Sequence, residues 1–323
     1  MVQKVIFSII ICTYNGALRI QDTLQHIAEL DSKEFEVEAL LIDNNSSDEV
    51  REVATEYWNQ IGAPFSFIVY KERKAGKSYA LARGIQESSG DFIIICDDDN
   101  WLQMDYLKIA VSKFKANPKL GIAGGVSLPV SDIPIPDWFN KYGYYYACGK
   151  RSETLHDFTG GKFLWGAGMI IPRAIAMKIS STRNPQILSC RKNDELISGG
   201  DDELCLRTWL LGYRTVFFPD LVLQHFIADY RLNMDYCNRL ITGFNVQSET
   251  INAYKILYAI YVSGWSSTLF LKKFTHYIWC TLLRDFETRK IVQNYLFFLS
   301  KGKFFKNKIN MDILNWYRAN TES

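Results

Sequence analysis

Three consecutive carboxylates follow one of the most apolar runs of the sequence. Residues 92–96 read FIIIC and lead without a break into Asp97, Asp98 and Asp99. Like charges crowded in this way repel one another, so the arrangement needs a compensating partner. Two carboxylates one residue apart can bind one Mg²⁺ or Mn²⁺ ion, which completes its shell with water and substrate phosphates. A solvated turn that caps the next helix would use the same residue types, so the cluster alone leaves both interpretations open.

A second acidic pair, Asp201 and Asp202, follows two glycines in the segment SGGDDELCLRTWLLGYR (residues 198–214). The pattern after the glycines predicts a helix. A carboxylate in its first turn is stabilised by the helix dipole, which also lowers the pKa of that carboxylate. Facing a crevice, it can act as general base for a hydroxyl nucleophile. Helix capping explains one aspartate well and the pair less well.

Three further features have both a functional and a structural interpretation. Asp43 ends an apolar run and can accept a hydrogen bond from a nucleotide base or ribose, or serve as a turn residue. His225 can bind metal or phosphate, although a lone histidine more often makes a structural hydrogen bond. The segment FLWGAGMIIPR (residues 163–173) places glycines beside a tryptophan. This suits close approach to a ligand and an aromatic face for a sugar ring, or a tryptophan packed over a turn.

Strand-length apolar runs alternate with helical patterns and must position these side chains. The runs lie at residues 5–12, 38–43, 65–70 and 92–96. They predict an α/β fold with an open, mostly parallel sheet flanked by helices. Such sheets bind ligands beyond the carboxyl ends of their strands. Polar residues follow the predicted strands at Thr13, Tyr14, Asn15, Asp43, Asn44, Asn45, Asp97, Asp98, Asp99 and Asn100.

Charge is unevenly distributed along the chain. The net charge of +2 over 323 residues argues against a nucleic-acid partner. From Glu249 onward there are 11 Lys/Arg against 5 Asp/Glu, and before it 26 against 30. Aromatic residues interleave with lysines from 254 to 308, where the longest uncharged stretch, 256–271, has 16 residues, fewer than the roughly 20 that span a bilayer. This part is expected either to contact a membrane surface or to form helices that pack on the sheet or make a homodimer.

The number and spacing of the cysteines indicate the cellular compartment of the protein. There are seven, with no CxxC pair, which argues against a disulfide framework or a zinc ribbon. A cytoplasmic location is therefore expected, with peripheral contact on the cytoplasmic face of a membrane if the basic aromatic region binds lipid.

Taken together and in order, these segments resemble family 2 glycosyltransferases with the A-type nucleotide-sugar transferase fold. The matching segments are SIIICTYNG, LLIDNNSSDE, GKSYALARGIQESSGDFIIICDDDN, WGAGMIIPR and GGDDELCLR, followed by His225. The resemblance covers about residues 5–230. It implies a transferase domain at 1–245, divided into a nucleotide-binding half (1–120) and an acceptor half (121–245), and then a mainly helical, basic-aromatic region at 246–323.

The resemblance also implies roles for single residues on the donor side. Asp43 matches the residue that contacts the nucleotide base. Asp99 matches the direct metal ligand of the DxD motif, with Asp97 and His225 completing the metal set. The whole donor-binding set is Thr13, Tyr14, Asn15, Asp43, Asn45, Lys77, Asp97 and Asp98.

On the acceptor side, Asp202 matches the catalytic base, the second acid of a Glu-Asp pair. The pair reads Asp201-Asp202 here, which leaves open which of the two carboxylates is the base. The residues expected beside the transferred sugar and the acceptor are Trp165, Gly166, Ala167, Gly168 and Met169.

The implied activity is inverting, metal-dependent transfer of a hexosyl or N-acetylhexosaminyl unit from a nucleoside-diphosphate sugar, expected to be UDP-linked. The acceptor would be a hydroxyl of a glycan or a lipid-linked molecule in surface polysaccharide synthesis, and the cofactor Mn²⁺ or Mg²⁺. Ala82 stands where the family often has asparagine. The Gln-x-x-Arg-Trp signature of processive synthases is missing, and YCNRL (236–240) lies about where it would fall. Single addition is therefore expected.

Two other functions compete with this one. A sugar-nucleotide-forming nucleotidyltransferase also uses an α/β sheet and acidic metal ligands. It usually has a Gly-rich basic loop after the first strand, whereas TYNGALRI has one Gly and one Arg. A catalytically inactive sugar-binding homologue would not need both acidic clusters. The missing GxGxxG fingerprint argues against a hydride-transfer enzyme.

Overall fold

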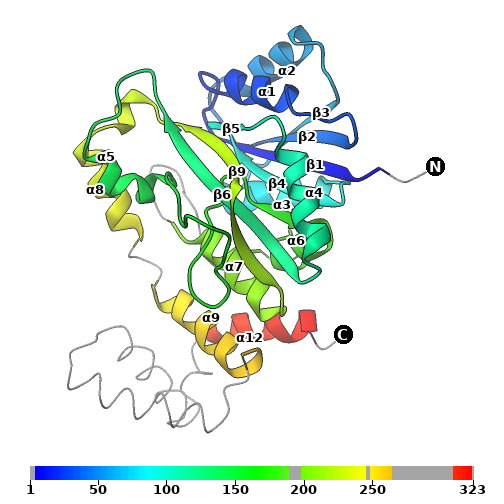
Figure 1. Ribbon diagram of the computed structural model, residues 1–323, viewed down its shortest axis with the longest axis vertical. Helices are drawn as coiled ribbons and strands as arrows, with labels where there is room; N and C mark the ends of the chain where they lie inside the picture. Colours follow the sequence, from blue (N-terminus) through cyan, green and yellow to red (C-terminus); the bar gives the residue numbers. More distant parts are fainter. Residues whose placement is uncertain (1–3, 184, 189–197, 245–247, 264–307, 322–323) are drawn as a thin grey trace.

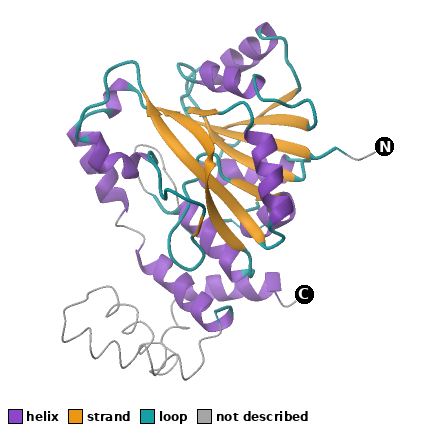
Figure 2. Cartoon of the chain, viewed as in Figure 1, coloured by secondary structure: helices purple, strands orange, loops and turns teal. Residues whose placement is uncertain are grey.

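The computed structural model describes residues 4–183, 185–188, 198–244, 248–263 and 308–321. They form one twisted sheet with helices on both faces (Figures 1 and 2). The strands lie in the order β3-β2-β1-β4-β8-β6-β9-β5, and β7 pairs with β9. Their bounds are β1 Ile6–Thr13, β2 Glu36–Asp43, β3 Ser66–Lys71, β4 Phe92–Asp97, β5 Asn100–Leu102, β6 Leu120–Val130, β7 His156–Asp157, β8 Ile170–Pro172 and β9 Arg214–Phe226.

Strand direction divides the sheet into two parts. β3, β2, β1 and β4 are parallel to one another. In the other part, β8 runs antiparallel to β4 and β6, β6 is parallel to β9, and β5 and β7 are antiparallel to β9. The parallel part therefore aligns the carboxyl ends of its strands along one edge.

The central strands are buried on both faces, which explains their unbroken apolar runs. In β1, Ile9 and Ile11 pack into one hydrophobic cluster and Ile10 into the opposite one. The first cluster includes α1 (Ile20–Ala28), α2 (Val50–Gln60) and α4 (Tyr106–Ala116). The opposite cluster includes α3 (Lys77–Glu87), α6 (Arg173–Ile179), α7 (Gly200–Leu210), α9 (Ser248–Tyr261) and α12 (Lys308–Thr321).

A smaller layer follows the carboxyl ends of β6 and β9. Its elements are α5 (Phe139–Tyr142), the short 3₁₀ helices η1 (Gly143–Tyr146) and η2 (Asp229–Arg231), and α8 (Met234–Phe244). Phe139, Tyr146, Ile227 and Leu240 form its own buried cluster. This layer brings residues from two distant parts of the chain to the side of the sheet's polar edge.

The predicted fold class is confirmed, with an open α/β sheet that is parallel in its first part and a C-terminal region that is helical where described. The division at residues 120 and 245 stays a prediction, and the sheet continues across the first of these boundaries. Tyr254 of α9 and Trp316 of α12 pack in the same core as α7. Of the stretch 254–308, residues 264–307 lie outside the described residues. No described helix is both long enough and apolar enough to traverse a bilayer.

Candidate active site

The carboxyl ends of β1, β2 and β4 lie side by side. Thr13 stands in register with Asp43, and Cys12 with Asp97. The polar residues that the sequence places after separate strands are thereby brought to one edge of the sheet, where a parallel α/β sheet binds its ligands.

Asp98 is the centre of a buried salt bridge in this edge. Its carboxylate accepts hydrogen bonds from Thr13 Oγ1 at 2.5 Å and from Arg19 Nε and Nη2, both at 2.8 Å. Arg19 also donates to the carbonyl oxygens of Tyr14 and Asn15, so it closes the loop after β1. The motifs do not single out Arg19; its signal in the sequence is one arginine in the loop that follows the first strand.

Asp97 and Asp99 are paired with cations as well. Lys77 Nζ lies 2.6 Å from Asp97 Oδ1. Asp99 lies between His225 Nε2 at 3.4 Å and Arg231 Nη1 at 3.0 Å. Burial opposes ionisation of Asp99, but these two partners outweigh it and hold the pKa of Asp99 well below its usual range. Burial also opposes a charge on His225, yet Asp99 raises the pKa of His225 to about 10.

The donor set fits a divalent cation in its chemistry. Asp97 and Asp99 offer the carboxylate oxygens that Mg²⁺ and Mn²⁺ prefer, and the depressed pKa of Asp99 keeps it ionised at neutral pH. His225 can join them once it loses its proton. Within the described ranges no three His, Cys, Asp or Glu side chains are grouped as metal ligands; Asp97 and Asp99 pair with Lys77 and Arg231 instead.

Asp43 is buried and holds the turn after β2. Its Oδ1 accepts a hydrogen bond from the backbone N–H of Ser46 at 2.8 Å, and its Oδ2 lies 3.2 Å from Arg51 Nε. Asn15 and Asn45 adopt left-handed backbone conformations, with φ of 52° and 62°, which asparagine tolerates. The N–H of Asn15 donates to Ser46 Oγ at 3.0 Å. The loops after β1 and β2 are thereby joined into one rim of the crevice.

Asp201 and Asp202 lie in the first turn of α7 as predicted, but they have different neighbours. Asp201 Oδ2 accepts the N–H of Gly166 at 2.9 Å. Asp202 is half-buried and, among the described residues, makes neither a hydrogen bond nor an ion pair. Burial and the charge of Asp201 raise the pKa of Asp202 to about 7, against the opposing charges of Arg151 and Lys255. The expected lowering of the pKa by the helix dipole is therefore wrong for Asp202.

Both acidic clusters act on the same buried thiol. Burial raises the pKa of Cys12 to about 12; Lys77 opposes this, and the charges of Asp97, Asp98 and Asp201 add to it. Hydrogen bonds connect the two clusters as well. The N–H of Gly166 binds Asp201, and two residues further on the N–H of Gly168 donates to the carbonyl oxygen of Ile95 in β4, two residues before Asp97. The first turn of α7 is therefore tied to the end of β4 through residues 166–168.

The glycine-rich segment divides between the crevice and the core. A Cβ on Gly166 would lie 2.4 Å from Asp201 Oδ1, so a larger residue here would displace the Asp201 carboxylate. The ring of Trp165 lies 5.0 Å from the Arg151 guanidinium. Beyond them the chain enters the core. Met169 is fully buried there, so its side chain packs between the sheet and the helices rather than facing an acceptor.

The residues between them lead inward in the same way. Ala167 is 8% exposed. Gly168 has φ of 69°, and its carbonyl accepts a hydrogen bond from Tyr106 Oη at 2.6 Å. Arg151 and Arg231, by contrast, reach the crevice without any motif to mark them in the sequence.

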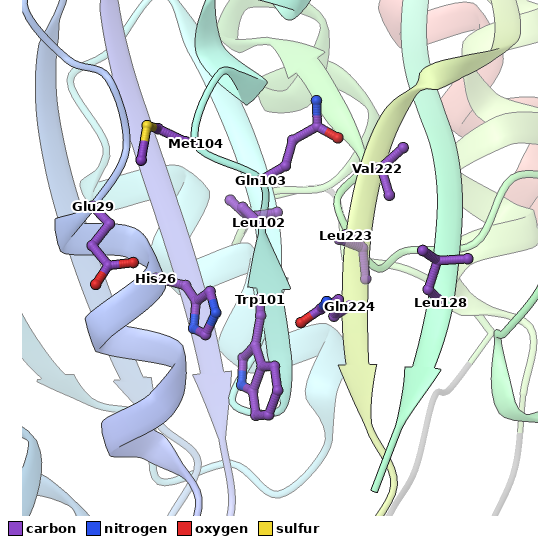
Figure 3. Close-up of a pocket in the computed structure, with 10 residues that line it drawn as sticks. All are labelled: His26, Glu29, Trp101, Leu102, Gln103, Met104, Leu128, Val222, Leu223 and Gln224. Carbon is purple, nitrogen blue, oxygen red and sulfur yellow. The ribbon is translucent and has the colours of Figure 1, made fainter. Parts of the chain in front are cut away.

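A cavity of about 210 Å³ lies elsewhere on the sheet, between α1, β5 and β9 (Figure 3). Within it the ring of His26 stacks on Trp101 at 4.9 Å between centroids. None of the predicted site residues is among the side chains that line it. This cavity is separate from the acidic crevice.

Known proteins match this chain in sequence. A model of glycosyl transferase family 2 matches residues 8–180, more than half of the chain. A poly-beta-1,6-N-acetyl-D-glucosamine synthase of Staphylococcus epidermidis is 30% identical over 150 residues, which are 46% of this chain and 35% of the synthase. The corresponding synthase of Staphylococcus aureus (strain COL) is 29% identical over 148 residues, with 45% and 35% covered. The match thus spans about a third of the length of these curated relatives.

Solved structures share the fold. A GalNAc-T7 structure with UDP, GalNAc and Mn²⁺ is 12% identical, with a TM-score of 0.54 and 78% of this chain and 51% of that chain covered. The mannosyltransferase PcManGT of Pyrobaculum calidifontis, in complex with GDP-Man and Mn²⁺, is 15% identical, with a TM-score of 0.52 and coverages of 99% and 88%. At these identities the likeness concerns the fold alone. Together with the family match, the ordered motifs and the acidic crevice lead to one conclusion: the chain belongs to glycosyl transferase family 2.

Proposed function

We propose that the protein is an inverting, metal-dependent glycosyltransferase that adds a single sugar to a glycan or lipid-linked acceptor in surface polysaccharide synthesis. One observation carries the proposal. The Asp97–Asp99 turn, which suits a nucleoside diphosphate, and the α7 acids, which suit a general base, are tied together by residues 166–168, which bind Asp201 at one end and Ile95 of β4 at the other. A transferase needs both functions at one point, whereas a sugar-binding protein needs only the first.

UDP-N-acetylglucosamine is the first donor to test. The matched relatives are N-acetylglucosamine polymer synthases. The loops after β1 and β2 would hold the base and ribose near Asp43. Lys77, Arg19 and Arg231 each pair with a carboxylate of the β4 turn, so the positive charge for a diphosphate would come from the divalent cation.

Asp99, Asp97 and His225 would hold the divalent cation, which when bound neutralises the diphosphate leaving group. The remaining chemistry belongs to side chains of the chain itself. Asp202 would take the proton from the acceptor hydroxyl, because it is half-buried, unpaired among the described residues and has a pKa of about 7. The hydroxyl oxygen then forms a bond to the anomeric carbon as the bond to the diphosphate breaks on the opposite side. The configuration at that carbon is inverted, and UDP leaves.

Asp201 has a different role in this mechanism. Its hydrogen bond to the N–H of Gly166 fixes the first turn of α7 against the glycine-rich segment. Its negative charge raises the pKa of Asp202 toward neutrality. Asp201 would therefore position and tune the base.

Calorimetry with UDP, UDP-N-acetylglucosamine and GDP, with and without Mn²⁺, tests the donor site. We expect Mn²⁺-dependent binding of one nucleotide, weakened at least about tenfold in Asp99→Ala. Release of UDP from donor and acceptor would then show transfer. Failure of every nucleotide to bind to folded protein would reject the proposal in favour of an inactive homologue. Pyrophosphate formation from UTP and a sugar phosphate would instead show a nucleotidyltransferase.

The place of action is a separate proposal. The excess of basic over acidic residues from Glu249 onward would favour contact with anionic lipid on the cytoplasmic face of a membrane. Flotation of the full chain with anionic liposomes tests it. Recovery of the protein in the unbound fraction at low salt would count against this proposal and leave the donor site unaffected.

A further inference from the structure

Beside Asp202 lies a group of four side chains, of which only Trp165 has a predicted role. We call Arg151, Lys255, Tyr144 and Trp165 the acceptor-side cluster. The guanidinium carbon of Arg151 lies 4.8 Å from the ring centroid of Tyr144 and 5.0 Å from that of Trp165. The two rings are 5.9 Å apart and inclined at 54°. Arg151 and Lys255 both act electrostatically on Asp202, so the cluster adjoins the proposed base.

The cations of this cluster lack acidic partners. Among the described residues, neither Arg151 nor Lys255 has a carboxylate oxygen within 4.0 Å. Lys255 lies 5.2 Å from the ring of Phe163 instead. Arg151 makes a side-chain hydrogen bond to Tyr144. A guanidinium stacked on aromatic rings has further in-plane N–H groups, and these remain available for a ligand. These groups match a carboxylate or a phosphate in geometry.

Trp165 adds an independent sign of a ligand. Its Nε1 atom is enclosed and has no hydrogen-bond partner in the part of the chain that the structure describes. Enclosed polar atoms in folded proteins nearly always have a partner, so one without needs an explanation. A bound sugar beside the ring would supply an acceptor oxygen. Tyr144, 43% exposed, supplies an aromatic surface for the same sugar.

We infer that the acceptor-side cluster binds an anionic group of the acceptor, so that the acceptor is an acidic glycan carrying a carboxylate or a phosphate close to the reacting hydroxyl. That the bound molecule is an acceptor rests on the proposed function, whereas the existence of an anion-binding site does not. Arg151 would hold the anion in its guanidinium plane, Lys255 would add a second positive charge, and the two rings would hold the sugar. The anion is not the donor diphosphate, which would lie at the strand ends with the divalent cation that Asp97 and Asp99 would hold.

Matched pairs of small sugars test the site on the full-length protein. The pairs are 4-nitrophenyl β-glucoside with 4-nitrophenyl β-glucuronide, and glucose with glucose 6-phosphate. Within each pair the members differ in one anionic group. Tryptophan fluorescence and calorimetry should show the charged member binding at least about tenfold more tightly in one pair or both, and which pair shows it identifies carboxylate or phosphate. Raising the salt concentration should reduce this preference.

Variants connect the preference to the cluster. Arg151→Gln should reduce the preference for the charged member about tenfold and leave the binding of the neutral member nearly unchanged, while Arg151→Lys should retain part of it. Arg83→Gln is the matched control. Arg83 also lies over an aromatic ring, at 5.6 Å from Tyr70, but it belongs to α3 and carries no role in the crevice. The Arg83→Gln variant should bind both members of each pair as the wild type does.

Each outcome has one consequence. Equal binding of both members, no binding of either, or an undiminished preference in Arg151→Gln overturns the inference. If Arg151→Gln does not fold, the salt dependence of the wild type decides in its place. A UDP titration on the same protein separates the two proposals. UDP binding without an anion preference would reject the acidic acceptor and leave the transferase proposal standing. An anion preference without UDP binding would reject the transferase proposal and leave the anion site standing.

Discussion

The two sides of the crevice handle charge in opposite ways. On the donor side, all three carboxylates of the β4 turn lie within 3.0 Å of a lysine or an arginine. On the acceptor side, Asp202 makes no ion pair with a described residue, and the same holds for Arg151 and Lys255. The donor side is thus neutralised within the protein, while the acceptor side keeps charges that a substrate can satisfy.

The difference shows how a protein keeps a reactive group ready. Three adjacent carboxylates are tolerable because each has a partner, and breaking a buried pair leaves an uncompensated charge. A general base must not be paired in this way, since a partner would lower its pKa and occupy its lone pairs. Asp202 therefore lies where burial and Asp201 keep its pKa near 7. Such a site reduces stability in exchange for activity.

The largest effect should come from removing the unpaired base. Asp202→Asn should lower kcat about a thousandfold and leave UDP affinity unchanged, because general-base catalysis contributes about 10²–10⁴-fold. Asp201→Asn is the matched control, with the same change one residue earlier. It should lower kcat about tenfold, since it weakens the contact with Gly166 but leaves a base. Steady-state kinetics measures kcat and calorimetry measures UDP affinity for both variants. A larger loss of kcat in Asp201→Asn than in Asp202→Asn would make Asp201 the base.

The pH dependence tests the same contrast. Because burial and Asp201 raise the pKa of Asp202 to about 7, the base is ionised only above that pH, and kcat should rise through pH 7 to a plateau. In Asp201→Asn the midpoint of this rise should move to lower pH. The folded state holds the proton more firmly than the unfolded chain, so stability should fall between pH 4 and pH 7 and then level off. In urea denaturation, the free energy of unfolding of Asp202→Asn should not show this fall between pH 4 and pH 7. A rate that is flat from pH 6 to pH 8 would contradict the assignment.

The structure also shows which parts of this contrast a sequence can reveal. Local signals were sufficient for the parallel strands and for the residues at their ends, because an apolar run followed by a polar cluster is continuous in the chain. They were also sufficient for the position of Asp201 and Asp202 on a helix. They were not sufficient for the pKa of Asp202, which depends on burial by elements far away in the sequence.

Local sequence patterns also do not predict the cationic partners of the site residues, for the same reason. Arg231 approaches Asp99 across 132 residues of chain, and Arg151 approaches Trp165 from the layer beyond β6. No spacing rule links such pairs, since tertiary packing creates them. The sequence also placed Met169 beside the acceptor because its segment begins at the crevice, although the chain turns inward within three residues.

A third prediction concerns what holds the acceptor side in place. Tyr254 of α9 donates its hydroxyl to Glu203 Oε1 at 2.5 Å and accepts from Arg207 Nε at 2.9 Å, all three side chains being buried. Tyr254→Phe should lower the free energy of unfolding by about 2 kcal/mol, because it removes one buried hydrogen bond from each of two charged groups, Glu203 and Arg207. Since Glu203 follows Asp202 directly, we also expect kcat to fall more than donor affinity.

Tyr258→Phe provides the control for that variant. Tyr258 lies one turn further along α9, and its hydroxyl makes no hydrogen bond with a described residue. Its loss should change the free energy of unfolding by less than about 0.5 kcal/mol. Equal urea midpoints for the two variants would show that the buried network does not support α7.

The smallest effect should come from altering one pair on the neutralised donor side while keeping its charge. Arg19→Lys retains a cation near Asp98 but loses the two parallel hydrogen bonds of 2.8 Å from Nε and Nη2 and those to the carbonyls of Tyr14 and Asn15. Because a lysine cannot reproduce that fork, the loop after β1 should become less well ordered and UDP affinity should fall about threefold in calorimetry. Arg83→Lys, in α3 and paired with Glu87, should leave UDP affinity unchanged. A loss of UDP affinity as large as that in Asp99→Ala would mean that Arg19 contacts the donor directly. The donor side would then also use a charge to bind its ligand, and the two sides would differ less than their ion pairs indicate.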